Sequence, residues 1–138
     1  MASPLIGHTI TAVQMDGMQD IKFILADRPP VIYRTDADCC SSTWIAHVEG
    51  VDRLIGGTVV SVEDIPMPGN NERDDDERYI QFYGLAIKTD KGTAVIDYRN
   101  ESNGYYGGSI SSDEENHYGG VFGQNVGSGQ FVPLVEDF

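Results

Sequence analysis

The sequence predicts an α+β fold that is mainly antiparallel β-sheet, arranged as two meanders with one short helix packed on the sheet. Segments rich in β-branched and aromatic residues recur along the chain, and clusters of Gly, Pro, Asn and Asp separate them. One stretch around Trp44 instead combines hydroxyl-bearing residues with apolar residues at helical spacing. Because the chain has 138 residues, we expect a domain with a core of its own.

The first meander is predicted from three strands over residues 9–15, 21–26 and 31–35. The turn at 16–20 contains glycine. The turn at 27–30 ends in two prolines, which cannot continue a β ladder. Strands joined by such short turns pair antiparallel.

The short helix is predicted over residues 43–49. Hydroxyl groups at 41–43 can cap its start, and Gly50 can end it in the left-handed conformation. Its buried face would consist of Trp44, Ile45 and Val48. Residues 51–55 would add a further turn.

A strand over residues 58–65 leads into a polar loop at 66–78. This acidic loop contains four consecutive acidic residues, Asp74, Asp75, Asp76 and Glu77. Like charges at such density repel one another within a sheet, so the loop is expected to lie in solvent. These four carboxylates are the candidate protein-binding residues.

The second meander is predicted over residues 79–112. Strands at 79–89 and 93–100 flank Asp90-Lys91-Gly92, which is typical of a three-residue hairpin loop with glycine last. Pairing Thr89 with Thr93 would place the ring of Tyr98 over Gly84. The Asn103-Gly104 turn would then lead into a third strand opened by residues 105–108.

Residues 1–112 are therefore expected to form a single α+β domain, and 113–138 a glycine-rich C-terminal tail. The tail carries apolar groups at 121–122 and 131–135. Since these groups are too large to leave in water, we expect the tail to dock on the sheet or on a second subunit.

The charge balance excludes several classes of partner. The chain has 22 acidic and 9 basic side chains, a formal net charge of −13. Binding to DNA, RNA or anionic membranes depends on Lys and Arg, so direct nucleic-acid or membrane binding is not expected, whereas a basic protein partner is. The sequence shows no apolar run that could span a membrane and no signal peptide, which predicts a cytoplasmic protein.

Cysteine and histidine give weak chemical signals. Cys39 and Cys40 with His47 could form a thiol nucleophile and base, and with His117 they could bind zinc. Adjacent cysteines are awkward zinc ligands, and no nucleophile signature surrounds them. We expect both cysteines to be small buried residues, with no catalytic site, metal or cofactor.

A cluster of polar and aromatic residues surrounds the Asn103-Gly104 turn. It comprises one guanidinium, two amides and two phenols: Arg99, Asn100, Asn103, Tyr105 and Tyr106. These groups suit a small planar or anionic ligand such as a nucleotide, through ion pairing, base-edge contacts and stacking. The alternative is a corner whose side chains satisfy the backbone groups of the turn.

Three patterns stand in order along the chain: LIGHTI at 5–10, DCCS at 38–41 and DYRNESNGYYGG at 97–108. Together they resemble a family of small phage and prophage proteins that carry a domain of unknown function. The resemblance covers residues 5–112, and the loop at 66–78 and the tail after 113 look like additions. It implies a phage accessory protein in a bacterial cytoplasm and supplies no catalytic residue.

We therefore expect a non-catalytic, phage-type binding protein that antagonises host defence. It would occupy a host protein through its acidic surface, or sequester a small nucleotide-like ligand near Arg99. A thiol- or metal-dependent hydrolase is one alternative. A structural phage assembly protein that oligomerises through the tail is another.

Overall fold

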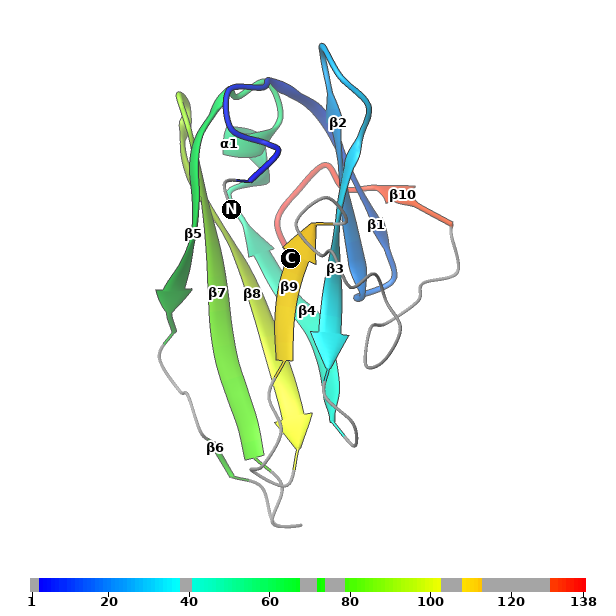
Figure 1. Ribbon diagram of the computed structural model, residues 1–138, viewed down its shortest axis with the longest axis vertical. Helices are drawn as coiled ribbons and strands as arrows, with labels where there is room; N and C mark the ends of the chain where they lie inside the picture. The colour runs from blue at the N-terminus through cyan, green and yellow to red at the C-terminus, as the bar shows by residue number, and fades with distance from the viewer. Residues whose placement is uncertain (1–2, 38–40, 68–71, 74–78, 103–107, 113–129) are drawn as a thin grey trace.

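The computed structural model describes residues 3–37, 41–67, 72–73, 79–102, 108–112 and 130–138. Its strands form two antiparallel sheets that share one hydrophobic core (Figure 1). One short helix, α1 (Val51–Leu54), lies at one end of the sheets. The predicted α+β class, dominated by antiparallel sheet, is confirmed.

The first sheet has the strand order β10-β1-β2-β3-β9. The second has the order β4-β8-β7-β5, with β6 paired to β7 beyond the end of β5. The first sheet consists of β1 (Ile10–Asp16), β2 (Asp20–Leu25), β3 (Val31–Ala37), β9 (Gly108–Ser112) and β10 (Val132–Pro133). The second consists of β4 (Ser42–Glu49), β5 (Val59–Pro66), β6 (Glu72–Arg73), β7 (Tyr79–Thr89) and β8 (Gly92–Ser102).

The core changes from apolar to polar along the strands. Alternate residues of a strand point to the same face, and the buried positions of β8 run from Ala94 and Ile96 through Tyr98 to Asn100 and Ser102. Thr35 on β3 and Thr43 on β4 are also buried. The core is therefore packed by apolar side chains at the end near α1. At the opposite end it contains polar side chains, which need hydrogen-bond partners.

The two meanders are present, but the second has different members from those predicted. The strands β1, β2 and β3 form the first as expected. The second consists of β5, β7 and β8. The third strand predicted within residues 79–112 exists as β9, but its predicted place in the second meander was wrong. It pairs with β3 in the first sheet, through Thr35 opposite Ile110 and Asp36 opposite Ser109.

The predicted helix over 43–49 was also wrong, because this stretch is strand β4. A β-bulge shifts the register between Ile45 and His47, so the inward-facing Ile45 and Val48 are three residues apart. That spacing imitates one face of a helix. The Ile45 N–H donates to the Met18 carbonyl at 2.7 Å, and Trp44 is half-buried on the outer face.

The β7–β8 hairpin is one residue tighter than predicted, since Thr89 pairs with Gly92. Gly84 therefore faces Asp97, and Tyr98 faces Tyr83. The tight turn is held from outside the hairpin: the Thr89 hydroxyl donates to the Arg53 carbonyl at 2.7 Å, and Asp90 accepts from the Thr58 N–H at 2.9 Å. These contacts with Arg53 in α1 and with Thr58, just before β5, explain why the local sequence did not reveal the register.

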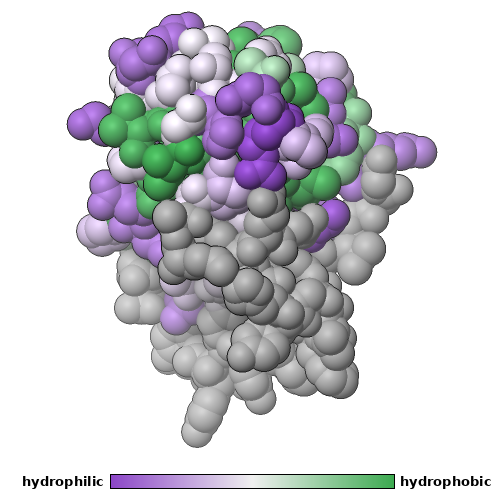
Figure 2. Space-filling view, turned by 45° about the horizontal axis from the view of Figure 1, so that its top comes forward, coloured by the Kyte–Doolittle hydropathy of each residue, from purple (hydrophilic) through white to green (hydrophobic). Residues whose placement is uncertain are grey.

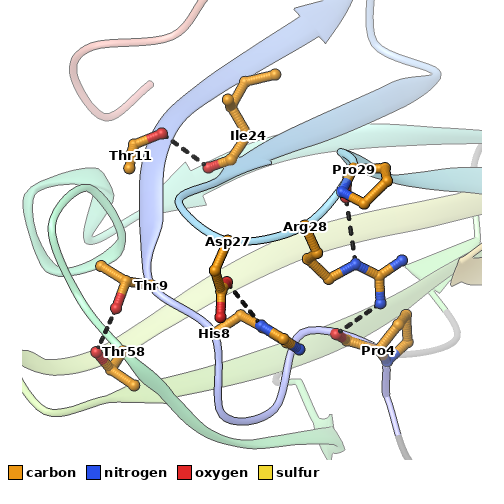
Figure 3. A network of polar contacts seen from close by, with 9 residues as sticks. All are labelled: Pro4, His8, Thr9, Thr11, Ile24, Asp27, Arg28, Pro29 and Thr58. Carbon is orange, nitrogen blue, oxygen red and sulfur yellow. Dashed lines mark hydrogen bonds and ion pairs between the residues drawn. The ribbon is translucent and has the colours of Figure 1, made fainter.

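A polar corner joins the sheets near the start of the chain (Figure 3). Thr9 and Thr58, which directly precede β1 and β5, form an isolated β-bridge, and their hydroxyl oxygens are 2.7 Å apart. His8 Nδ1 lies 2.8 Å from Asp27 Oδ1, and Arg28 donates to the Pro4 carbonyl at 3.4 Å. The N-terminal segment is thereby fastened to the β2–β3 turn.

Residues 130–138, here called the strap, cross from one sheet to the other. The strand β10 pairs with β1, and the Leu134 N–H donates to the Val13 carbonyl at 2.8 Å. At its other end the Asp137 carboxylate accepts from the N–H groups of Gly50 at 3.0 Å and Val51 at 2.8 Å. The strap therefore docks on both sheets of the same chain.

The attachment of Asp137 is expected to depend on pH. Hydrogen bonds from Gly50 and Val51, with help from the Arg53 charge, lower the pKa of the Asp137 carboxyl below its ordinary value. A lowered folded-state pKa means that the contact is fully formed above the ordinary value and is lost as the pH falls through the lowered one. The Gly50 and Val51 amide shifts in NMR spectra should titrate with a midpoint below the ordinary aspartate value.

The Asp137→Asn variant is the control for this titration and should show no transition of those two amides in the same range. Two other titratable groups lie close by in the strap's surroundings: Glu136, next in sequence, and His47, whose Nδ1 is 3.2 Å from the Phe138 carbonyl oxygen. A midpoint at or above the ordinary aspartate value would contradict the contact.

Within the ranges described, no helix combines the length and the apolar character needed to cross a bilayer.

Candidate functional site

Arg99 lies on the outer face of the second sheet. Its guanidinium donates to both carboxylate oxygens of Asp97, at 3.2 and 3.4 Å, and its Cζ atom lies 4.2 Å from the ring centroid of Phe82. Trp44 is its cross-strand neighbour on β4. Cross-strand neighbours share a face, so an aromatic–cation–aromatic row crosses three strands here. The guanidinium is already engaged by a carboxylate and a ring.

Asn100 lies on the opposite, inner face and is fully buried. Its amide nitrogen donates to the hydroxyl oxygens of Ser41 at 3.1 Å and Thr43 at 3.0 Å. Its Oδ1 atom has no hydrogen-bond partner among the described residues. Arg99 and Asn100 therefore do not face a common site.

The other members of the predicted ligand cluster, Asn103, Tyr105 and Tyr106, lie outside the described residues, and their role stays a prediction. Ser102, next to them, is buried on the inner face. The buried Asn100 and Ser102 support the alternative interpretation, in which these polar groups hold the corner together.

Sequence analysis missed a stacked tyrosine pair near this corner. The rings of Tyr83 and Tyr98 are nearly parallel, with centroids 5.1 Å apart. Burial, together with the charge of Asp64 and the neighbouring Tyr83, raises the pKa of Tyr98 well above its ordinary value. The one-residue shift in hairpin register creates this pair, so a correct register was the only signal that could have revealed it.

The acidic residues Asp74, Asp75, Asp76 and Glu77 also lie outside the described residues. The strand that precedes their loop is described: β5 is an edge strand of the second sheet. It exposes Glu63 and Asp64, which point to opposite faces of the strand. We call these two residues the acidic edge. In the sequence, these two residues come just before the acidic loop at 66–78.

Only one of the candidate thiol and zinc residues, His47, lies in the described structure. Cys39, Cys40 and His117 lie outside the described residues, and His47 is exposed on β4. Among the residues that the structure describes, no group of three or more His, Cys, Asp or Glu side chains is placed to hold a metal ion.

The His8–Asp27 pair was missed because its partners are distant in sequence and meet only through the β2–β3 turn.

Comparison with known proteins gives a family and no function. No curated protein and no solved structure matches the chain. A family model described as a domain of unknown function, DUF7448, matches residues 3–112, which include both sheets except the strap strand β10. The chain therefore belongs to the DUF7448 family.

Proposed function

We propose that this protein is a non-catalytic binding protein that occupies a basic protein partner. The observation that carries the proposal is the acidic edge: the edge strand β5 exposes Glu63 and Asp64. Four further acidic residues, Asp74, Asp75, Asp76 and Glu77, follow them in the sequence. The net charge of −13 adds a long-range attraction for a positively charged surface.

The side chains at Arg99 favour this partner over a small nucleotide-like ligand. A guanidinium that grips a phosphate must be available for bidentate contacts, and that of Arg99 is held by Asp97 and Phe82. Asn100 points to the other face and is buried. The Arg99 guanidinium and the Asn100 amide, which the small-ligand hypothesis places in one site, therefore lie on opposite faces of the sheet.

Surface hydropathy also favours recognition by charge. Figure 2 shows hydrophobic side chains in separate groups among hydrophilic ones on the face that it presents. Of the exposed large apolar residues of the described structure, Ile6, Met18 and Val60 come from three different segments, and Val132, Val135 and Phe138 lie in the strap. Scattered apolar side chains are normal on a surface and do not define a docking face.

The biological setting is part of the proposal. The DYRNESNGYYGG pattern at 97–108 resembles phage and prophage proteins, so we propose a phage accessory protein that acts in the bacterial cytoplasm. A small acidic protein that acts by binding fits an antagonist that blocks a host defence protein by occupying its basic surface.

Neutralising the acidic loop should weaken partner capture. We expect the full chain that carries Asp74→Asn, Asp75→Asn and Asp76→Asn to capture less partner from a host lysate than the wild type does, by a factor of about ten or more. The reason is that charges at the rim of an interface steer association. Raising the salt from about 50 to about 200 mM should weaken wild-type capture as well, since exposed charges are screened. Quantitative mass spectrometry of the captured protein measures both effects.

A matched variant tests whether position matters beyond total charge. Glu49→Gln, Asp52→Asn and Glu136→Gln also remove three negative charges, from exposed positions near α1 and the strap. This variant should capture the partner nearly as well as the wild type. Equal losses in the two variants would reject the acidic loop as the binding surface.

A further inference from the structure

The strap occupies a surface that belongs to the family domain, although the strap itself lies outside the family match. The surface is formed by the outer edge of β1, the end of β4 and the backbone of Gly50 and Val51, all within residues 3–112. The strap follows residues 113–129, a stretch rich in glycine. The strap therefore resembles a ligand that is tethered to the domain on which it binds.

The first half of the surface recognises an extended chain. Val132 and Pro133 add a short strand to β1, opposite Met15 and Gln14. Main-chain pairing at a sheet edge is a general way to bind peptides, and side-chain pockets supply selectivity. Leu134 supplies it here, because its side chain packs against the hydrophobic core.

The second half of the surface recognises a carboxylate three residues further on. The Asp137 side chain accepts two backbone hydrogen bonds, from Gly50 and Val51, and Arg53 lies close enough for its charge to act on the carboxyl. Phe138 and Val48 then exchange two main-chain hydrogen bonds of 3.3 Å each. Backbone donors with a nearby guanidinium select an acidic side chain over a neutral one.

Most of the strap's attachment is main-chain hydrogen bonding, with little buried hydrocarbon. Val132, Val135 and Phe138 remain exposed by 63%, 74% and 42%. Segments with few buried apolar contacts open at a small fraction of the global unfolding free energy. The strap can therefore leave its surface while the two sheets stay folded.

We propose that this surface is a peptide-binding surface, which the strap covers in cis. It takes an extended peptide segment of a partner protein that carries an aliphatic residue three positions before an aspartate. The strap is then a built-in competitor, and only a partner segment that matches its pattern displaces it. This site is separate from the acidic edge on β5.

The test uses a fluorescent peptide with the sequence of residues 130–138 and the full chain carrying Asp137→Asn, whose own strap is held less tightly. Fluorescence anisotropy should show this chain binding the peptide about ten-fold more tightly than the wild-type chain does, because its own strap covers the peptide-binding surface less of the time. A peptide that itself carries Asp137→Asn should bind about ten-fold less tightly than the wild-type peptide.

Two further chains complete the test. Leu134→Ala loosens the strap at its other end and should also raise peptide affinity, so the test does not depend on one variant folding well. Glu136→Gln, at an exposed position, should leave affinity at the wild-type level. No binding to either loosened chain at about 1 mM peptide, or equal affinity for the two peptides, would overturn the proposal.

Discussion

Replacing Arg34 by methionine is expected to lower the free energy of unfolding by about 3 kcal/mol. Arg34 on β3 faces Asp20 on β2, and its Nη1 atom lies 2.5 Å from Asp20 Oδ2. The Asp20 side chain is 1% exposed and that of Arg34 is 25% exposed. Removing the cation leaves a carboxylate buried without the charge that compensates it. Urea unfolding followed by circular dichroism measures the effect.

Lys88→Met is the matched control, because it removes a positive charge from an exposed position on β7. We expect it to change the unfolding free energy by no more than about 0.5 kcal/mol. Arg34→Lys should recover part of the loss, since it restores the charge without the planar fork. A urea midpoint for Arg34→Met equal to that of the wild type would show that the ion pair does not stabilise the first sheet.

Gly108→Ala is expected to destabilise the protein by at least about 2 kcal/mol. Gly108 opens β9 where the two sheets meet. A Cβ atom there would overlap the Thr43 hydroxyl and lie 2.9 Å from the Asn100 amide nitrogen and 3.1 Å from the Asp36 carbonyl. Thr43 and Asn100 are hydrogen-bonded to each other and buried, so neither can yield without losing that bond. Thermal and urea unfolding both report the change.

A double-mutant cycle separates this overlap from a general weakening of β9. Thr43→Ala removes the hydroxyl that a Cβ at 108 would strike, so the double variant should be more stable than the sum of the single effects predicts. Ser109→Ala, at an exposed position on the same strand, should be nearly neutral. Strict additivity of Gly108→Ala and Thr43→Ala would contradict the close approach of the sheets.

Much of the fold could be predicted because the strands carry their own local signals. Alternating apolar residues and the turn residues between them located β1, β2, β3, β5, β7 and β8 to within a few positions. The turns at 16–20 and 27–30 also indicated that consecutive strands pair. These features depend on neighbours in sequence, which sequence analysis can read.

The errors arose where distant contacts override local preference. The bulge in β4 gave Ile45 and Val48 a helical spacing, and only its pairing with β8 reveals the strand. The hairpin register was set by Arg53 and Thr58, which belong to other elements. The partner of β9 is β3, which is far away in sequence and lies in the other sheet.

The candidate site could be predicted only as a set of residue types. Composition placed Arg99 and Asn100 in one cluster, whereas strand alternation puts them on opposite faces. No sequence pattern points to Asp137 as the hydrogen-bond acceptor of Gly50 and Val51, because a single acid in a tail has no pattern around it. Its role follows from the path of the strap across both sheets.

Hydrogen exchange of the full chain, with and without the captured partner protein, tests the proposed function most directly. We predict slower exchange in the peptides that cover β5 and the loop at 66–78, and unchanged exchange in residues 130–138. Protection confined to the strap and the peptide-binding surface beneath it, or no protection of β5 and the loop at 66–78, would contradict binding through the acidic edge.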